Sequence, residues 1–159
     1  MSKIKVIGIG SPFGDDSIGW EAATKLKERE IIQSYLPEIL SIETHDRPGV
    51  RLLEIMGGAD TVLLIDAIVS GNPVGTLYRF VNNDIYELNS LVSTHAIGVV
   101  ETLQLGRALH QLPDNIILYG IEIDVMNSVV ASELIASAIH QLVDCIEREI
   151  LQIFNSEKA

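Results

Sequence analysis

The sequence predicts an α/β fold, a three-layer α/β/α sandwich around a mostly parallel, mixed sheet of five strands. Patterns typical of strands and helices alternate along the chain with short connections. The continuous apolar run at residues 62–65 is typical of a strand covered on both faces, as in the middle of such a sheet. With 159 residues, no repeat and no linker, the chain is expected to form one domain over residues 1–159.

The first half of the chain contains five of the expected elements. Residues 3–9 are rich in β-branched side chains and predict the first strand, and residues 17–30 carry apolar side chains at helical spacing. Residues 39–44 predict a second strand. Residues 50–56 predict a short helix closed by a Gly-Gly pair, and residues 61–65 predict the buried third strand.

The second half continues the alternation. A Gly-Asn-Pro turn precedes residues 75–81, whose alternating pattern predicts a fourth strand, and residues 82–94 are polar and irregular. Residues 95–109 predict a helix and residues 115–123 a buried strand. Residues 132–154 repeat apolar side chains along one face and predict a long closing helix.

Composition limits the classes of function. The net charge of −11 disfavours nucleic acid and anionic membranes as partners, because both are bound through Lys and Arg. An acidic surface suits a cationic or metal-bearing partner, although it equally serves solubility. No apolar run approaches a membrane span and no signal peptide is recognisable, so a cytoplasmic location is expected. The single cysteine, Cys145, excludes an internal disulfide and a cysteine-cluster metal site.

The loop after the first strand resembles a dinucleotide-binding loop only superficially. Gly8 and Gly10 form a Gly-x-Gly pair, but Phe13 occupies the place of the third glycine. Asp15 and Asp16 stand where a helix would receive a pyrophosphate, and carboxylates repel phosphates. One aspartate is enough to cap the following helix, so the second indicates a further role.

Three polar side chains are expected at one edge of the sheet, because loops that leave the carboxyl ends of parallel strands share an edge. Asp16 follows the first strand, Asp66 ends the buried third strand, and His95 begins a helix. Two carboxylates and an imidazole suit a divalent metal. Each residue also has a structural explanation: a helix cap for Asp16, a carboxylate bonded to loop amides for Asp66, and a structural histidine for His95.

Three segments resemble the motifs of a known family. Residues 8–19, Gly-Ile-Gly-Ser-Pro-Phe-Gly-Asp-Asp-Ser-Ile-Gly, resemble the Gly-x-Gly-Asn-x-x-x-x-Asp-(Asp/Glu)-x-x-Gly motif of the hydrogenase maturation endopeptidases. Residues 64–68 resemble that family's apolar strand ending in Asp-Ala, and residues 93–98 resemble its Ser-x-His block. The order and approximate spacing of the motifs match over nearly the whole chain.

The resemblance implies an endopeptidase that removes the C-terminal extension of a [NiFe]-hydrogenase large-subunit precursor after nickel insertion. It places Asp16, Asp66 and His95 at the metal-binding positions. Because three ligands leave coordination positions on nickel open, we expect the precursor to supply the metal. The nickel would then act as the recognition element. No organic cofactor is expected. Either the metal polarises the scissile carbonyl and activates water, or Asp16 or Asp66 acts as general base.

Two segments depart from the family pattern. Ser11 replaces the usual Asn after the second glycine. Residues 45–49, His-Asp-Arg-Pro-Gly, replace a Gly-rich stretch on the same edge of the sheet, so His45 and Asp46 are candidates for recognition of the precursor. A Pro-Gly turn with an exposed ion pair explains the same residues equally well.

Two other functions fit the residues alone. One is a non-catalytic α/β module that binds a small ligand or a protein at the same edge of the sheet, without dependence on metal. The other is a metal-dependent peptidase or amidase that acts on small substrates. A serine hydrolase is disfavoured because the chain has no Gly-x-Ser-x-Gly motif.

Overall fold

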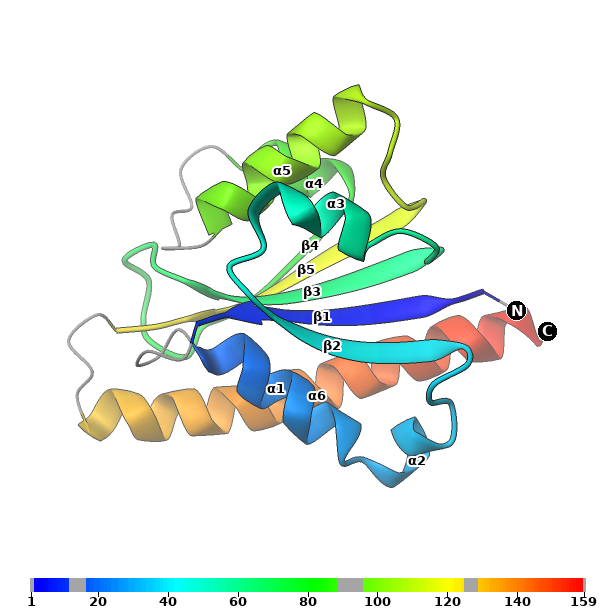
Figure 1. The fold of residues 1–159 in the computed structure, drawn as a ribbon. Helices are drawn as coiled ribbons and strands as arrows, with labels where there is room; N and C mark the ends of the chain where they lie inside the picture. Colours follow the sequence, from blue (N-terminus) through cyan, green and yellow to red (C-terminus); the bar gives the residue numbers. More distant parts are fainter. Residues whose placement is uncertain (1, 12–16, 89–95, 125–128, 159) are drawn as a thin grey trace.

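A computed structural model describes residues 2–11, 17–88, 96–124 and 129–158. The five strands in these ranges form one mixed sheet in the order β2-β1-β3-β5-β4, and helices cover both faces (Figure 1). The strands are β1 (Ile4–Gly10), β2 (Leu40–Asp46), β3 (Thr61–Ile68), β4 (Leu77–Val81) and β5 (Asn115–Glu122). Strand β4 is antiparallel to its neighbour, whereas the other four strands are parallel and end at the same edge. The predicted α/β/α sandwich with a mixed five-stranded sheet is confirmed.

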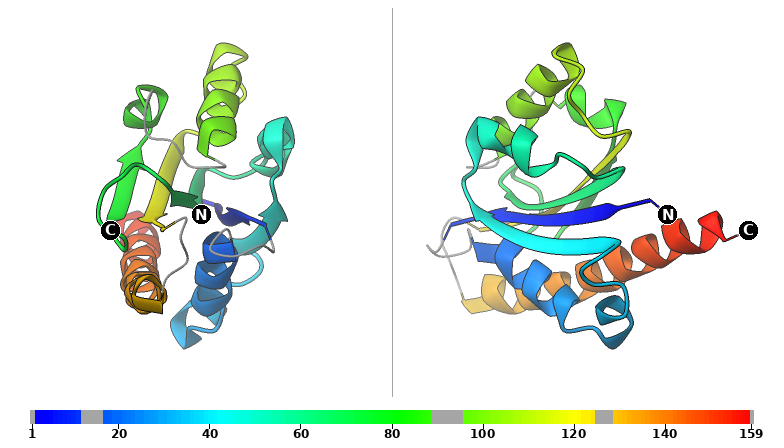
Figure 2. Two further views of the ribbon diagram at one scale, coloured as in Figure 1. Left: turned by 90° about the vertical axis from the view of Figure 1, so that its left-hand side faces the viewer. Right: turned by 45° about the vertical axis from the view of Figure 1, so that its right-hand side comes forward.

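The helices form two layers (Figures 1 and 2). We call the layer on one face the α6 layer; it contains α1 (Ile18–Lys27), α2 (Glu30–Gln33) and α6 (Val129–Glu157). We call the other the α5 layer; it contains the 3-10 turn η2 (Gly49–Arg51), α3 (Leu52–Ile55), α4 (Asn83–Tyr86) and α5 (Ala96–Ala108). Each layer packs on its face of the sheet through a separate cluster of buried apolar side chains.

The central strand β3 separates these two cores. All eight of its residues are buried, because one set of alternating side chains enters each core. Leu63 and Ile65 belong to the core of the α6 layer, whereas Val62 and Leu64 belong to the core of the α5 layer. This alternation determines the face to which each polar residue of β3 and β5 points.

Away from the carboxyl edge, an ion-pair cluster joins β4 and β5 to α6. Arg79 donates two hydrogen bonds to the Glu149 carboxylate, at 2.9 and 3.0 Å, and the Tyr119 hydroxyl donates to the same group. Burial raises the pKa of Glu149, but the bonds from Arg79 and Tyr119 outweigh it and leave the pKa below its ordinary value. Burial and the bond to Glu149 raise the pKa of Tyr119.

The structure corrects several predicted elements. The third strand continues to Ile68 rather than ending at residue 65, because Ala67 and Ile68 still pair with β5. The second strand continues to Asp46, paired with Gly10, so His45 and Asp46 lie in a strand rather than in a loop. Within 82–94, predicted as irregular, residues 83–86 form the short helix α4. The closing helix is longer than predicted at both ends: it begins three residues before the predicted range and ends three residues after it.

Candidate functional site

Asp66 lies inside β3 at the carboxyl edge, two residues before the strand ends. Its position in the alternation of the strand matches Val62 and Leu64, so its side chain points to the α5 layer. The side chain is completely buried, and Oδ1 accepts a 2.8 Å hydrogen bond from the backbone N–H of Ala67. An ionisable group in such a strand lowers stability unless it is compensated. The burial and the amide bond fit both predicted explanations, a metal ligand and a carboxylate held by backbone amides, so the role of Asp66 stays a prediction.

The residue of β5 that pairs with Asp66 is a glycine. Asp66 pairs with Gly120 of β5, which has no side chain on this face. A Cβ at Gly120 would collide with the Cδ1 atom of Ile68, the next β3 residue on the same face as Asp66. A larger residue at position 120 would therefore displace side chains beside Asp66.

Two glycines of the first motif, Gly8 and Gly19, serve packing. A Cβ on Gly8 would collide with the carbonyl of Gly19, and a Cβ on Gly19 would collide with the carbonyls of Ile9 and Ile65. Helix α1 therefore approaches β1 and β3 backbone to backbone, which only glycine allows. Ile65 directly precedes Asp66, so the first turn of α1 is in contact with the strand segment that carries the buried carboxylate.

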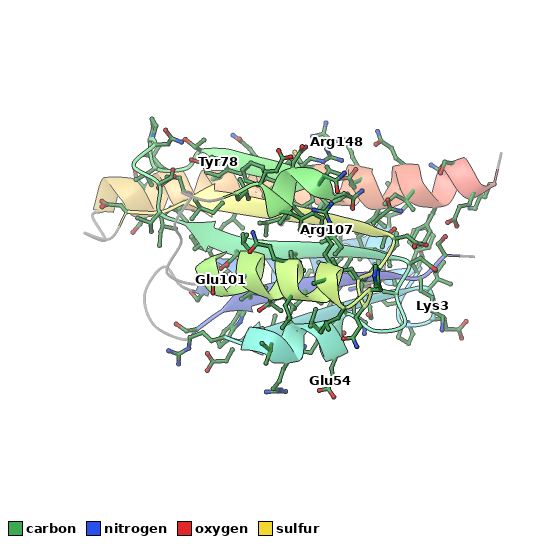
Figure 3. The ribbon with its side chains drawn as sticks, turned by 90° about the horizontal axis from the view of Figure 1, so that it is seen from above. Lys3, Glu54, Tyr78, Glu101, Arg107 and Arg148 are labelled. Carbon is green, nitrogen blue, oxygen red and sulfur yellow. The ribbon has the colours of Figure 1, made fainter. Side chains whose placement is uncertain are left out.

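A second buried carboxylate, Glu122, lies at the same edge and faces the same layer as Asp66. The Glu122 carboxylate accepts hydrogen bonds from the backbone N–H of Ser70 at 2.7 Å, from the Ser70 hydroxyl, and from the Tyr78 hydroxyl at 2.7 Å. Tyr78 is labelled in Figure 3, and its hydroxyl also accepts a 2.7 Å bond from Asn72. These bonds tie the β3–β4 connection to β5, so Glu122 has a structural role.

His45 and Asp46, predicted to recognise the precursor, end the edge strand β2. The His45 ring nitrogen Nε2 lies 3.3 Å from a Glu43 carboxylate oxygen, and the His45 carbonyl accepts a 3.0 Å bond from the Trp20 indole N–H. Asp46 is exposed and accepts a 2.9 Å bond from Arg47 Nε. The exposed ion pair of the alternative interpretation is present, and the role in recognition stays a prediction.

A cleft of about 230 Å³ opens between the end of β1, the segment after β2, and the first turn of α5. Its apolar floor consists of Ile9, Leu52 and Val99, each at most 4% exposed. Its remaining lining residues among those described are Arg47, Pro48, Gly49 and Gly98. No pattern in the sequence indicates this cleft, because its walls come from three segments far apart in the chain.

Only one of the three predicted metal ligands lies in the described part of the chain, so their grouping stays a prediction. Asp16 and His95 lie outside the described ranges, whereas Asp66 lies inside them. In the described part of the chain, no three His, Cys, Asp or Glu side chains are grouped closely enough to hold a metal ion. No helix among the same residues is long and apolar enough to cross a membrane.

Comparisons with known proteins give a consistent assignment. A family model described as hydrogenase maturation protease (HycI) matches residues 48–149. The hydrogenase 2 maturation protease of Escherichia coli K12 is 30% identical over 122 residues, which cover 75% of this chain and 72% of that protein. A solution structure of an endopeptidase from Escherichia coli superimposes with a TM-score of 0.74 and 25% identity, covering 92% of this chain and 93% of the other.

A further solved structure, the hydrogenase maturating endopeptidase HybD of Escherichia coli, has the same fold. It is 24% identical, has a TM-score of 0.72, and the match covers 92% of this chain and 93% of that one. These relatives are peptidases, so the comparisons favour an enzyme over a non-catalytic binding module. The chain is a peptidase and belongs to the hydrogenase maturation protease family.

Proposed function

We propose that this protein removes the C-terminal extension of a [NiFe]-hydrogenase large-subunit precursor after nickel has been inserted, and that it recognises the bound nickel. The observation that carries the proposal is the buried Asp66 carboxylate at the carboxyl edge of the sheet. A carboxylate there can serve as a metal ligand or as a base, the two roles that this hydrolysis requires.

Two connections in the chain support a role for Asp16 and His95 beside Asp66. Gly19 is in contact with Ile65, and Asp16 precedes Gly19 by three residues, a chain length of at most about 11 Å. His95 directly precedes Ala96, the first residue of α5, and α5 packs over the face to which Asp66 points. In the proposal, Asp16, Asp66 and His95 together complete the coordination of nickel held by the precursor.

Nickel belongs to the substrate in this proposal. Two carboxylates and one imidazole are oxygen and nitrogen donors that suit a divalent first-row metal, and three ligands leave coordination positions for groups of the precursor. A precursor without nickel would lack the ion that joins the two proteins. The proposal therefore explains why cleavage would follow nickel insertion.

Hydrolysis itself has two routes in this proposal. In the first, nickel polarises the scissile carbonyl and lowers the pKa of a bound water molecule. In the second, nickel only docks the precursor, and Asp16 or Asp66 removes a proton from the attacking water. Asp66→Asn distinguishes the two routes. If Asp66 is a metal ligand, the variant should bind the precursor more weakly, because an amide is a weaker ligand; if Asp66 is the base, the variant should bind the precursor but not cut it.

The test uses the purified large-subunit precursor, either loaded with nickel or depleted of it, and follows its intact mass during incubation with the protein. We expect one C-terminal truncation, only with the nickel-loaded precursor, and no truncation by Asp66→Asn or His95→Ala. Asp84→Asn is the matched control, because Asp84 is an exposed residue of α4. It should cleave at the wild-type rate.

Binding measurements on the same samples separate the two routes. If Asp66→Asn binds the nickel-loaded precursor normally but does not cut it, Asp66 acts as a base; if binding is lost, Asp66 acts as a ligand. Equal cleavage of loaded and depleted precursor would refute recognition of nickel. Cleavage of short unrelated peptides, with the precursor left intact, would instead support a peptidase of small substrates.

A further inference from the structure

The cleft between β1, residues 47–52 and α5 begins beside Asp66. Strands β1 and β3 are paired up to Gly8 and Ile65, and the next residues along them are Ile9 and Asp66. Both side chains point to the α5 layer, since Ile9 belongs to the same core as Leu64. Neighbouring strands lie about 4.8 Å apart, so the floor of the cleft starts one strand away from the buried carboxylate.

The cleft suits an apolar side chain. Ile9, Leu52 and Val99 form an apolar floor, and Gly98 in α5 leaves room above it, because a Cβ at this position would meet no atom of the described residues outside its own helix backbone within 4 Å. Val50 lies in the chain between the lining residues Gly49 and Leu52 and is 64% exposed. A bound peptide that covered its side chain would be stabilised by the burial of apolar surface.

Arg47 adds a positive charge at this cleft, in a protein of net charge −11. Its position is fixed by a 3.1 Å hydrogen bond from its backbone N–H to the carbonyl of Gly10. Its Nε pairs with Asp46, but both side chains are about half exposed, at 56% and 50%. An exposed pair of this kind contributes little, so a carboxylate on a bound peptide can replace Asp46 at small cost.

We propose that this cleft binds the C-terminal extension of the precursor, with an apolar side chain of the extension on the Ile9–Leu52–Val99 floor and a carboxylate of the extension paired with Arg47. This inference rests on the proposed function. Successive residues of an extended peptide are about 3.3 Å apart, so residues within two or three positions of a bond cut at Asp66 reach the cleft. Arg47 and the floor thereby select which sequences are cut.

The test compares two charge reversals in steady-state cleavage of the nickel-loaded precursor at low ionic strength. Arg47→Glu should lower kcat/KM by about tenfold or more, because it replaces an attractive charge by a repulsive one. Arg51→Glu changes the net charge by the same amount in the same segment, but Arg51 does not line the cleft, and its kcat/KM should change by less than about twofold. Unfolding by urea verifies that both variants are folded.

Two further variants test the partner and the floor. An Asp→Lys or Glu→Lys change at the paired position of the extension should restore cleavage by Arg47→Glu and weaken cleavage by the wild type. Gly98→Leu should fill the cleft and raise KM, whereas Glu101→Leu, which places the same side chain three residues further along α5, should not. Glu101 is exposed on the helix and is labelled in Figure 3.

The outcomes separate this inference from the proposed function. If the wild type leaves the nickel-loaded precursor uncut, the proposed function is refuted. If the wild type cuts it, and Arg47→Glu and Gly98→Leu cut it with wild-type kcat/KM, only the role of the cleft is refuted. Equal losses for Arg47→Glu and Arg51→Glu would show a general charge effect and would also refute the specific role of Arg47.

Discussion

Gly19→Ala should destabilise the protein by forcing α1 away from the sheet. A Cβ at position 19 would lie 2.6 Å from the carbonyl oxygen of Ile65 and 2.9 Å from the backbone nitrogen of Ile9, and closer still to the Ile9 carbonyl. These are backbone atoms of two paired strands, so they cannot rotate away as a side chain would. The helix itself must move.

The magnitude follows from two opposing effects. Overpacking usually costs about 1–3 kcal/mol, and the rigid surroundings place this substitution near the upper end, at about 3 kcal/mol. Alanine in place of glycine in a helix returns up to about 1 kcal/mol. The free energy of unfolding should therefore fall by about 2 kcal/mol, which corresponds to a Tm lower by about 4–8 °C for a chain of this size.

Urea unfolding followed by circular dichroism measures this change, with Gly98→Ala as the matched control. Gly98 also lies in the first turn of a helix, but a Cβ there would meet no atom within 4 Å in the part of the chain that the structure describes, beyond its own helix backbone. Alanine should therefore leave stability unchanged or raise it by up to about 1 kcal/mol. Equal stability of the two variants would refute the idea that Gly19 serves close packing of α1 against the sheet. Cleavage by Gly19→Ala should also fall, because the displaced helix contacts the residue before Asp66.

Two further predictions concern stability. The Glu149 pKa is depressed in the folded protein by Arg79 and Tyr119, so its stabilising effect is present above its ordinary pKa of 4.5 and is lost as the pH falls through the folded value. Glu149→Gln should therefore cost more stability at pH 7 than at pH 3 in urea unfolding, and an equal cost at both would contradict this. Tyr78→Phe removes a 2.7 Å bond to the buried Glu122 and should cost about 1.5–3 kcal/mol in the same assay, whereas wild-type stability would contradict the structural role of Glu122.

The order of strands and helices could be predicted because each long element has a clear local pattern. The limits of the elements were less accurate where tertiary pairing decides them. The sequence predicts that the third strand ends near Asp66, because a charged residue follows four apolar ones. In the structure, Ala67 and Ile68 still pair with β5, so the strand continues past Asp66. Helix α4 has only four residues with one buried side chain, Ile85, which is too short for a helical period to be recognised.

The candidate site was predictable only in part. Asp66 was identified from its place after a buried strand, and the structure shows it buried at the expected edge. The bonds of Glu122 to Ser70 and Tyr78 span 52 and 44 residues of chain, so no local pattern indicates them. The cleft at Arg47 likewise depends on segments that meet only in the folded protein.

The bond between the Trp20 indole and the His45 carbonyl has a practical consequence. Trp20 is the only tryptophan of the chain, and it joins the first turn of α1 to the end of β2, directly before the segment that lines the cleft. Its emission therefore comes from one known place, next to the region where the precursor would dock. Trp20 fluorescence therefore provides an intrinsic signal for precursor binding. Stopped-flow fluorescence can use it to measure the rate of binding separately from the rate of cleavage, without an attached label.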